Sequence, residues 1–237
     1  MSLSDPLGNL FNKKPDARMF LPDRELPMSD KYIGIEIEAE NIIYTNESLS
    51  PLLSYWSVVH DGSLRNYGTE FVSAMLRGMD IKAALEELSR VFTTHDINPD
   101  YSDRTSVHIH VDTRFLNLAQ LRTLILNYLV LEPYIFSYIG HSRENNSYCI
   151  PYYKNTGGLR NLAKLFKREV TEASVQDAVL RAVKYEAMNI RSISEKGSIE
   201  FRHYYGTHDV PTLYSWIKVI LSLFHLVKQS SEENFYS

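Results

Sequence analysis

Residues 33–40 read Ile-Gly-Ile-Glu-Ile-Glu-Ala-Glu, and this two-residue alternation is the strongest fold signal in the chain. Successive side chains of a strand point to opposite faces, so a strand here carries aliphatic groups on one face and Glu36, Glu38 and Glu40 on the other. For Glu36 and Glu38 alone, a solvated sheet face is the ordinary interpretation, since charged residues are mostly exposed. Neighbouring carboxylates also repel one another, however, and a bound cation would relieve that repulsion.

Two further segments alternate in the same way and carry histidines, acids or an arginine on one face. They are residues 106–112, with His108 and His110, and residues 198–204, with Glu200 and Arg202. Residues 55–60 and 69–73 also read as strands, because turn-forming residues join them. Three strands that each present such side chains on one face favour a shared, cation-filled site.

Helical periodicity marks the other long segments. Asp80 is the expected N-cap of the first of them, and the second is expected to break before Pro133. The elements follow in the order strands, helix, strand, helices, strand, helix, which differs from the regular alternation of βαβ units. This order favours an α+β fold with a largely antiparallel sheet. The helical segments are residues 80–94, 118–131, 174–188 and 211–228.

Composition narrows the function classes. The 237 residues are 44% hydrophobic and 23% charged, as is ordinary for a packed globular protein. A net charge of −4 argues against a general nucleic-acid binder. The single cysteine, Cys149, permits no internal disulfide and favours a reducing, cytoplasmic location. No uncharged apolar run is long enough to predict a membrane span, and no signal peptide is predicted.

The pattern of prolines divides the chain near residue 30. Residues 1–30 contain prolines that recur among polar residues and block helices, so we expect an extended arm there. Residues 31–237 show no linker-like stretch and are expected to form one domain. The arm is a candidate for docking a partner or for assembly into an oligomer.

The candidate ligands favour a magnesium-type cation. They are rich in carboxylate oxygen, which Mg²⁺ and Mn²⁺ prefer, whereas zinc favours more imidazole or thiolate. Arg202 lies two residues after Glu200 on the same strand face and suits developing phosphate charge. The chain lacks a P-loop, so a nucleotide would be held mainly through metal. The candidate ligands are Glu36, Glu38, Glu70, Glu200 and one of His108 and His110.

The motifs in their order resemble the amidoligases of the carboxylate–amine ligase superfamily, which includes glutamine synthetase and glutamate–cysteine ligase. The resemblance spans about residues 32–207. The segments that carry it are Gly34–Glu38, Asp61–Leu64, Gly68–Ser73, Val107–Val111, Arg143–Cys149, Lys184–Asn189 and Ile199–Arg202.

The resemblance implies a fold and a set of roles. The fold would be similar to the glutamine synthetase catalytic domain, with a curved antiparallel sheet, metal-ATP on its concave face and helices packed behind. Asp61 would lie near the acceptor amine, and Arg202 would contact phosphate. The implied metal ligands are Glu36, Glu38, Glu70, His110 and Glu200, and the implied substrate or phosphate contacts are His108, Arg143, Lys184 and Arg65, with the choice between His108 and His110 as ligand left open.

The implied activity is ATP-dependent amide formation through an acyl phosphate, with Mg²⁺ or Mn²⁺ as cofactor. The partners would be a nucleotide, a carboxylate and an amine, with no nucleic acid and no membrane. Members of the family are often bacterial or phage-borne, and the expected acceptors are peptides, proteins or cell-wall fragments. This implies the cytoplasm of a bacterial or phage-infected cell.

Two other functions remain open at this level. Residues 108–112 read His-x-His-x-Asp, which resembles the motif of metal-dependent hydrolases, although Thr113 stands where that motif expects a further histidine. A non-catalytic binding or structural relative, for instance one associated with a virion, would use the arm to dock a partner. The glycines of residues 155–160 fit a plain turn better than a phosphate contact.

Overall fold

The computed structural model describes residues 6–11 and 31–232. The described chain divides into two compact units, each built from segments that are distant in the sequence. The first, here called the β1 unit, comprises residues 31–110 and 204–218. The second, the α4 unit, comprises residues 6–11, 111–203 and 219–232. The prediction that residues 31–237 form one domain stays a prediction.

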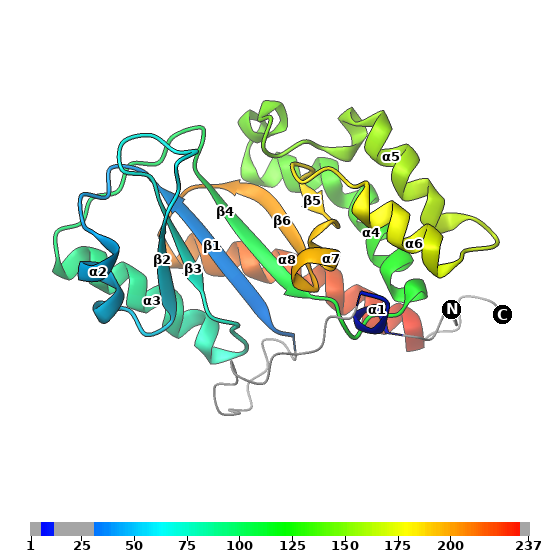
Figure 1. The fold of residues 1–237 in the computed structure, drawn as a ribbon, viewed down its shortest axis with the longest axis horizontal. Coiled ribbons are helices and arrows are strands. Elements are labelled where there is room, and N and C mark those ends of the chain that lie inside the picture. The colour runs from blue at the N-terminus through cyan, green and yellow to red at the C-terminus, as the bar shows by residue number, and fades with distance from the viewer. Residues whose placement is uncertain (1–5, 12–30, 233–237) are drawn as a thin grey trace. The chain divides into compact units, whose positions relative to one another are not determined.

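The fold is α+β with a six-stranded antiparallel sheet in the order β2-β3-β1-β4-β6-β5 (Figure 1). This confirms the predicted fold class, while the likeness to glutamine synthetase stays a prediction. Five strands were predicted to within one residue at each end, and only β5 was missed. The strands are β1 Ile33–Ala39, β2 Trp56–His60, β3 Thr69–Ser73, β4 Ser106–Asp112, β5 Met188–Asn189 and β6 Ser198–Tyr205.

The apolar face of the β1 unit packs against helix α3 (Met79–Thr94), which passes behind β2 and β3 in Figure 1. The Phe71 and Phe92 rings meet edge to face with their centroids 5.1 Å apart. The Trp56 indole N–H donates to the Ala84 carbonyl at 2.9 Å. Burial of these large side chains supplies the main force that holds strand and helix together.

The N-cap of α3 is Gly78, so the prediction that Asp80 caps this helix was wrong. Gly78 has a φ of 56°, which suits a residue without a Cβ and lets the chain turn into the helix two residues earlier. Asp80 then lies in the first turn, where a negative charge still favours the helix dipole.

The pairing of β1 with β3 sets which side chains share the polar face. Both β1 and β2 run antiparallel to β3, with Glu38 opposite Glu70 and Glu36 opposite Val72. Directly opposed residues project to the same side of a sheet, so the acids of the two strands lie on one face. The alternation in residues 33–40 is therefore realised as a strand with one apolar and one acidic face.

Helix α4 (Leu118–Ile139) begins with a capping box, in which Asn117 and Gln120 exchange side-chain and backbone hydrogen bonds. It continues through Pro133, so the predicted break before this residue was wrong. Pro133 lies on the exposed side, where water can bond the carbonyl that proline leaves without a donor. The buried Ile135 and Phe136 then hold the last turns against the α4 unit.

The helix predicted over residues 174–188 is shorter than expected. Helix α6 spans Glu172–Leu180, and the chain then turns into β5. The Ala187 N–H donates to the Ile150 carbonyl at 2.9 Å, and the Arg202 N–H donates to the Ala187 carbonyl at 2.9 Å. These bonds to distant segments outweigh the local helical period.

Helix α8 (Val210–Glu232) contains the predicted segment 211–228. Its stretch Val210–Val227 is long and apolar enough to cross a membrane by length and composition. Its buried side chains, among them Leu213, Trp216 and Ile217, recur at the three- and four-residue spacing that is typical of a core helix. The evidence for a membrane span is therefore weak.

Within the predicted arm, only residues 6–11 are described. Helix α1 (Leu7–Leu10) buries Leu7 completely, and the Leu7 N–H donates to the Leu116 carbonyl at 2.8 Å. This segment is thus helical and packed on the α4 unit, while the other residues of the arm lie outside the described ranges. The shorter helices are α2 Asn46–Leu49, α5 Thr156–Leu162, α7 Ser192–Lys196 and the 3₁₀ turns Ser50–Leu52, His141–Asn145, Tyr152–Lys154 and Ala163–Phe166.

Candidate metal centre

The acidic face of β1 is buried. Glu36 and Glu38 are each 8% exposed, which excludes the interpretation of a solvated sheet face. Glu40 is also buried, and its Oε1 accepts the Arg65 backbone N–H at 2.8 Å, so it anchors the turn between β2 and β3. Glu36 and Glu38 are therefore the candidate metal ligands of β1, and Glu40 has a structural role.

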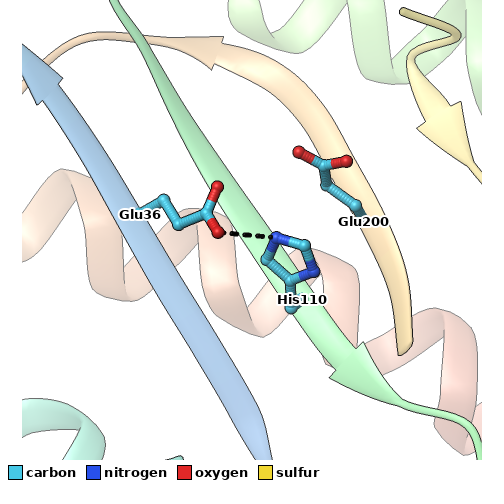
Figure 2. Close-up of side chains that lie close together, drawn as sticks. All are labelled: Glu36, His110 and Glu200. Atoms are coloured by element: carbon cyan, nitrogen blue, oxygen red, sulfur yellow. Dashed lines mark ion pairs between the residues drawn. The ribbon is translucent and has the colours of Figure 1, made fainter. Parts of the chain in front are cut away.

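Glu36 is held by two imidazoles of β4. His108 Nδ1 lies 3.1 Å from Glu36 Oε2, and His110 Nε2 lies 3.2 Å from Glu36 Oε1. Figure 2 shows the second of these ion pairs as a dashed line between β1 and β4. Burial alone would raise the pKa of Glu36, but the hydrogen bonds and charges of His108 and His110 hold this pKa well below its usual range. Glu36 is thus a carboxylate at neutral pH.

Glu70 shows what the crowding of acids does. Burial and the negative charges of Glu36, Glu38 and Asp61 raise the pKa of Glu70 to about 7, although His108 acts in the opposite direction. Ligand atoms of Glu36, Glu70 and His108 all lie within 4.8 Å of one another. A carboxyl group with so high a pKa in a cluster of acids lacks a compensating positive charge.

The donor set of this group fits a hard divalent cation. Carboxylate oxygens dominate, and imidazole is the accessory donor, which suits Mg²⁺ or Mn²⁺ better than zinc. A cation placed here would relieve the repulsion that raises the pKa of Glu70. The residues that could hold it within the β1 unit are Glu36, Glu38, Glu70, His108 and His110.

The turn between β2 and β3 carries two more predicted site residues. Asp61 is half-buried, and its Oδ1 accepts the Ser63 N–H at 2.8 Å. A Cβ at Gly68 would meet the Asp61 carbonyl oxygen at 2.7 Å, so only glycine fits this close approach. Arg65 is exposed and lies 3.8 Å from Asp103, which leaves its predicted phosphate contact a prediction.

Glu200 and Arg202 lie on β6 in the α4 unit, and Figure 2 draws Glu200 on that strand. The Asn189 side-chain amide donates to Glu200 Oε2 at 2.6 Å, and Arg202 Nη1 forms an ion pair with Glu200 Oε1. Arg202 Nε also donates to the Tyr148 carbonyl at 3.0 Å. Sequence reasoning missed Asn189 as a partner of Glu200, because β5 is too short to show alternation. That Glu200 completes the site of Glu36 stays a prediction.

Arg143 bonds the backbone of β6, and its predicted contact with substrate or phosphate stays a prediction. It is 4% exposed, and its guanidinium donates to the Arg202 carbonyl at 3.0 Å and to the His203 carbonyl at 2.9 Å. It thus stabilises the backbone of β6 next to Arg202. Lys184 is exposed, and its predicted role stays a prediction.

The structure also bears on Cys149, on the glycines of residues 155–160 and on the His-x-His-x-Asp motif. Burial raises the pKa of the Cys149 thiol to about 12, so it is a poor nucleophile. Gly157 and Gly158 lie in the first turn of helix α5, which the Asn155 side chain caps, so the prediction of a plain glycine turn was wrong. Arg114 Nε and Nη2 donate to the two carboxylate oxygens of Asp112 at 2.8 Å each. This carboxylate is thus already paired and does not offer the free metal ligand that the hydrolase motif requires.

A comparison with protein families gives independent support to one of the interpretations. The family described as "putative amidoligase enzyme" matches residues 13–224, which is most of the chain. The chain belongs to this amidoligase family. A search of curated proteins found no match. Membership indicates an enzyme that forms amide bonds, and it agrees with the family resemblance of the sequence motifs.

Proposed function

We propose that this amidoligase joins a carboxylate to an amine in a reaction driven by ATP, with Mg²⁺ or Mn²⁺ held by Glu36, Glu38, Glu70 and His110. The observation that carries the proposal is the cluster of buried acids and imidazoles on β1 and β4, beside which the half-buried Glu70 of β3 has a pKa of about 7. Glu200 of β6 is proposed as a further ligand on the basis of the sequence motif.

The residues divide the work of phosphoryl transfer. The bound cation would neutralise the charge of the ATP phosphates, which is the main electrostatic requirement of this reaction. The side chains of β1, β3 and β4 hold their donor atoms on a buried sheet face, so little reorganisation is needed. Arg202 is proposed to bind phosphate oxygens of the nucleotide through its guanidinium. To do so, it would break some of its present contact with Glu200.

The proposed reaction has two steps. An oxygen of the substrate carboxylate attacks the γ-phosphorus, the bond from that phosphorus to ADP breaks, and an acyl phosphate forms. The amine nitrogen then attacks the acyl carbon, inorganic phosphate leaves, and the nitrogen loses a proton. Asp61 is proposed to bind the incoming ammonium or to accept this proton. We propose a peptide, protein or cell-wall fragment as the acceptor, in the bacterial cytoplasm.

Nucleotide binding is the first test of this function. Calorimetric titration with a non-hydrolysable ATP analogue is expected to show binding that requires Mg²⁺ and is lost in Glu36→Gln. Glu87→Gln is the matched control, because Glu87 is a buried acid of the β1 unit that binds the Ser54 and Tyr55 backbone N–H groups at 3.0 Å. The control is expected to bind the analogue normally. Absence of binding by the wild-type protein with either Mg²⁺ or Mn²⁺ would refute the ligase proposal.

Turnover is the second test. Hydroxylamine replaces the amine, and a panel of amino-acid and peptide carboxylates is screened for ADP release and hydroxamate formation. Carboxylate-dependent ADP release that Glu36→Gln lacks is the expected result. ADP release that is equal in wild type and Glu36→Gln would assign the activity to another protein.

A further inference from the structure

A chain of hydrogen bonds through β4 joins the carboxylates of Glu36 and Glu38. The Ser106 hydroxyl donates to Glu38 Oε2 at 2.6 Å, and the Ser106 backbone N–H donates to the same oxygen at 2.9 Å. His108 Nε2 lies 2.7 Å from Ser106 Oγ, and His108 Nδ1 lies 3.1 Å from Glu36 Oε2. All four residues belong to the β1 unit, and all are buried.

These contacts engage the same oxygen, Oε2, of each glutamate. The other oxygens have different surroundings: Glu36 Oε1 lies 3.2 Å from His110 Nε2, and Glu38 Oε1 is 3.8 Å from His108 Nε2, beyond hydrogen-bond distance. A carboxylate that is fixed through one oxygen keeps a defined direction for the second. The chain of hydrogen bonds therefore sets the orientation of two neighbouring acids that would otherwise repel each other.

We propose that Ser106 and His108 are positioning residues, which orient Glu36 and Glu38 for a divalent cation without binding that cation themselves. The proposal rests on the proposed function of the same site, and it replaces the expectation that His108 contacts substrate phosphate. His110, which meets the Oε1 atom of Glu36, is then the imidazole that binds the metal.

The surroundings of His108 support this division. The side chain is 2% exposed, and both ring nitrogens lie within 3.1 Å of oxygens of the protein. A histidine binds a metal through a ring nitrogen without a proton, so His108 would have to give up one of these contacts to become a ligand. The proximity of His108 to Glu36 and Glu70 defines the competing assignment, in which His108 is a ligand.

Ser106→Ala is the decisive variant, because it removes a hydroxyl that belongs to no candidate ligand. Removal of a group that orients a ligand typically weakens metal affinity by about 10- to 100-fold. We expect a loss of this size in Mn²⁺ affinity, measured by electron paramagnetic resonance on protein whose fold is verified by circular dichroism. Ser106→Thr keeps the hydroxyl and is expected to restore most of the affinity.

Ser73→Ala is the matched control on β3. Its hydroxyl accepts the Ile35 N–H at 2.8 Å and donates to the Ala74 carbonyl at 2.8 Å, so it supports the sheet without touching the acids. This variant is expected to lower thermal stability and to leave Mn²⁺ affinity unchanged. An equal loss of affinity in Ser73→Ala and Ser106→Ala would mean that Ser106 acts only through the fold.

Pulsed magnetic resonance of bound Mn²⁺ separates the two histidines, because it detects nitrogen nuclei that coordinate the ion. The nitrogen signal is expected to disappear in His110→Gln and to persist in His108→Gln, even though the second variant also binds Mn²⁺ more weakly. Loss of the signal in His108→Gln, or unchanged affinity in both Ser106→Ala and His108→Gln, would overturn the proposal. Failure of the wild-type protein to bind Mn²⁺ would instead refute the proposed function.

Discussion

Both units of this protein bury glutamates, but they compensate the negative charge in different ways. In the α4 unit, Glu132 accepts the Tyr128 hydroxyl at 2.6 Å and the backbone N–H groups of Tyr152 and Tyr153 at 3.0 and 3.1 Å. Glu186 likewise accepts the Tyr152 hydroxyl at 2.8 Å. These carboxyl groups are satisfied by neutral donors of the protein, so they need no cation.

In the β1 unit, the acids lie beside other acids. Glu38 and Glu70 are directly opposite each other on β1 and β3. A carboxylate oxygen of Glu36 lies within 4.8 Å of one of Glu70. Two imidazoles compensate Glu36, yet the pKa of Glu70 still rises to about 7. Burial of a carboxylate alone therefore does not identify a site, whereas acids and imidazoles whose ligand atoms lie within 4.8 Å of one another do indicate one.

The largest effect is expected from a loss of stability in the α4 unit. Glu132→Ala leaves the Tyr128 hydroxyl and two backbone N–H groups buried without their acceptor, so the free energy of unfolding should fall by about 4 kcal/mol. Urea denaturation followed by circular dichroism measures this change. A loss below about 1 kcal/mol would contradict the structural role of Glu132.

The next effect is a loss of metal affinity in the β1 unit. Glu38→Gln removes one charged donor oxygen and should weaken Mn²⁺ binding by about 100-fold, which corresponds to about 2.7 kcal/mol. Its free energy of unfolding without metal should change little or rise, because one of several mutually repelling charges is gone. Calorimetry measures the Mn²⁺ affinity, and urea denaturation of the same preparation measures the stability. Lower stability with normal affinity would mean that Glu38 has a structural role and does not bind the metal.

The pH dependence of metal binding should follow Glu70. Because its pKa is raised to about 7, a proton occupies the carboxyl group below this pH and competes with the cation. Mn²⁺ affinity should therefore fall by up to about tenfold for each pH unit below 7, and Glu70→Gln should flatten this dependence. Without metal, the raised pKa stabilises the fold below the unfolded value near 4.5, and that contribution is lost as the pH rises through 7. A pH-independent affinity between 6 and 8 would contradict this account.

The smallest effect is expected from His203 in the α4 unit. Burial, together with the nearby charge of Arg143, lowers the pKa of His203 to about 3, so the folded protein holds this ring neutral. Its contribution to stability is present above the unfolded pKa of 6.5 and is lost as the pH falls towards 3, by at most about 1.4 kcal/mol per pH unit. His203→Gln keeps an N–H donor for the Tyr128 hydroxyl oxygen and should lose less stability between pH 6.5 and 5. Identical pH profiles of the two proteins would refute the assignment.

Much of the fold could be predicted from the sequence, because strand alternation is a local property. The alternation in residues 33–40 and 106–112 is enough to place Glu36, Glu38, His108 and His110 on the polar faces of their strands. Alternation does not reveal whether such a face meets solvent or is covered, because burial depends on how the strands and helices pack. The hydrogen-bond chain through Ser106 was missed for the same reason, since it depends on side-chain packing between strands.

Other elements were mispredicted because distant contacts decide them. Proline usually ends a helix, yet α4 continues past Pro133 since its next residues bury against the core. The predicted helix over residues 174–188 gives way to β5, which two hydrogen bonds to remote segments stabilise. The bonds of Arg143 to carbonyls of β6 likewise could not be predicted from the sequence, because they depend on the tertiary fold.

The central claim is that the acids of β1 and β3 hold a divalent cation, whereas Glu132 of the α4 unit takes no part in binding it. Titration of Mn²⁺ into wild type, Glu36→Gln and Glu132→Gln, followed by electron paramagnetic resonance, tests it most directly. The account predicts binding by the wild type and by Glu132→Gln, and loss of binding in Glu36→Gln, which remains folded. Equal binding by Glu36→Gln and wild type, or no binding by the wild type with or without nucleotide, would contradict it.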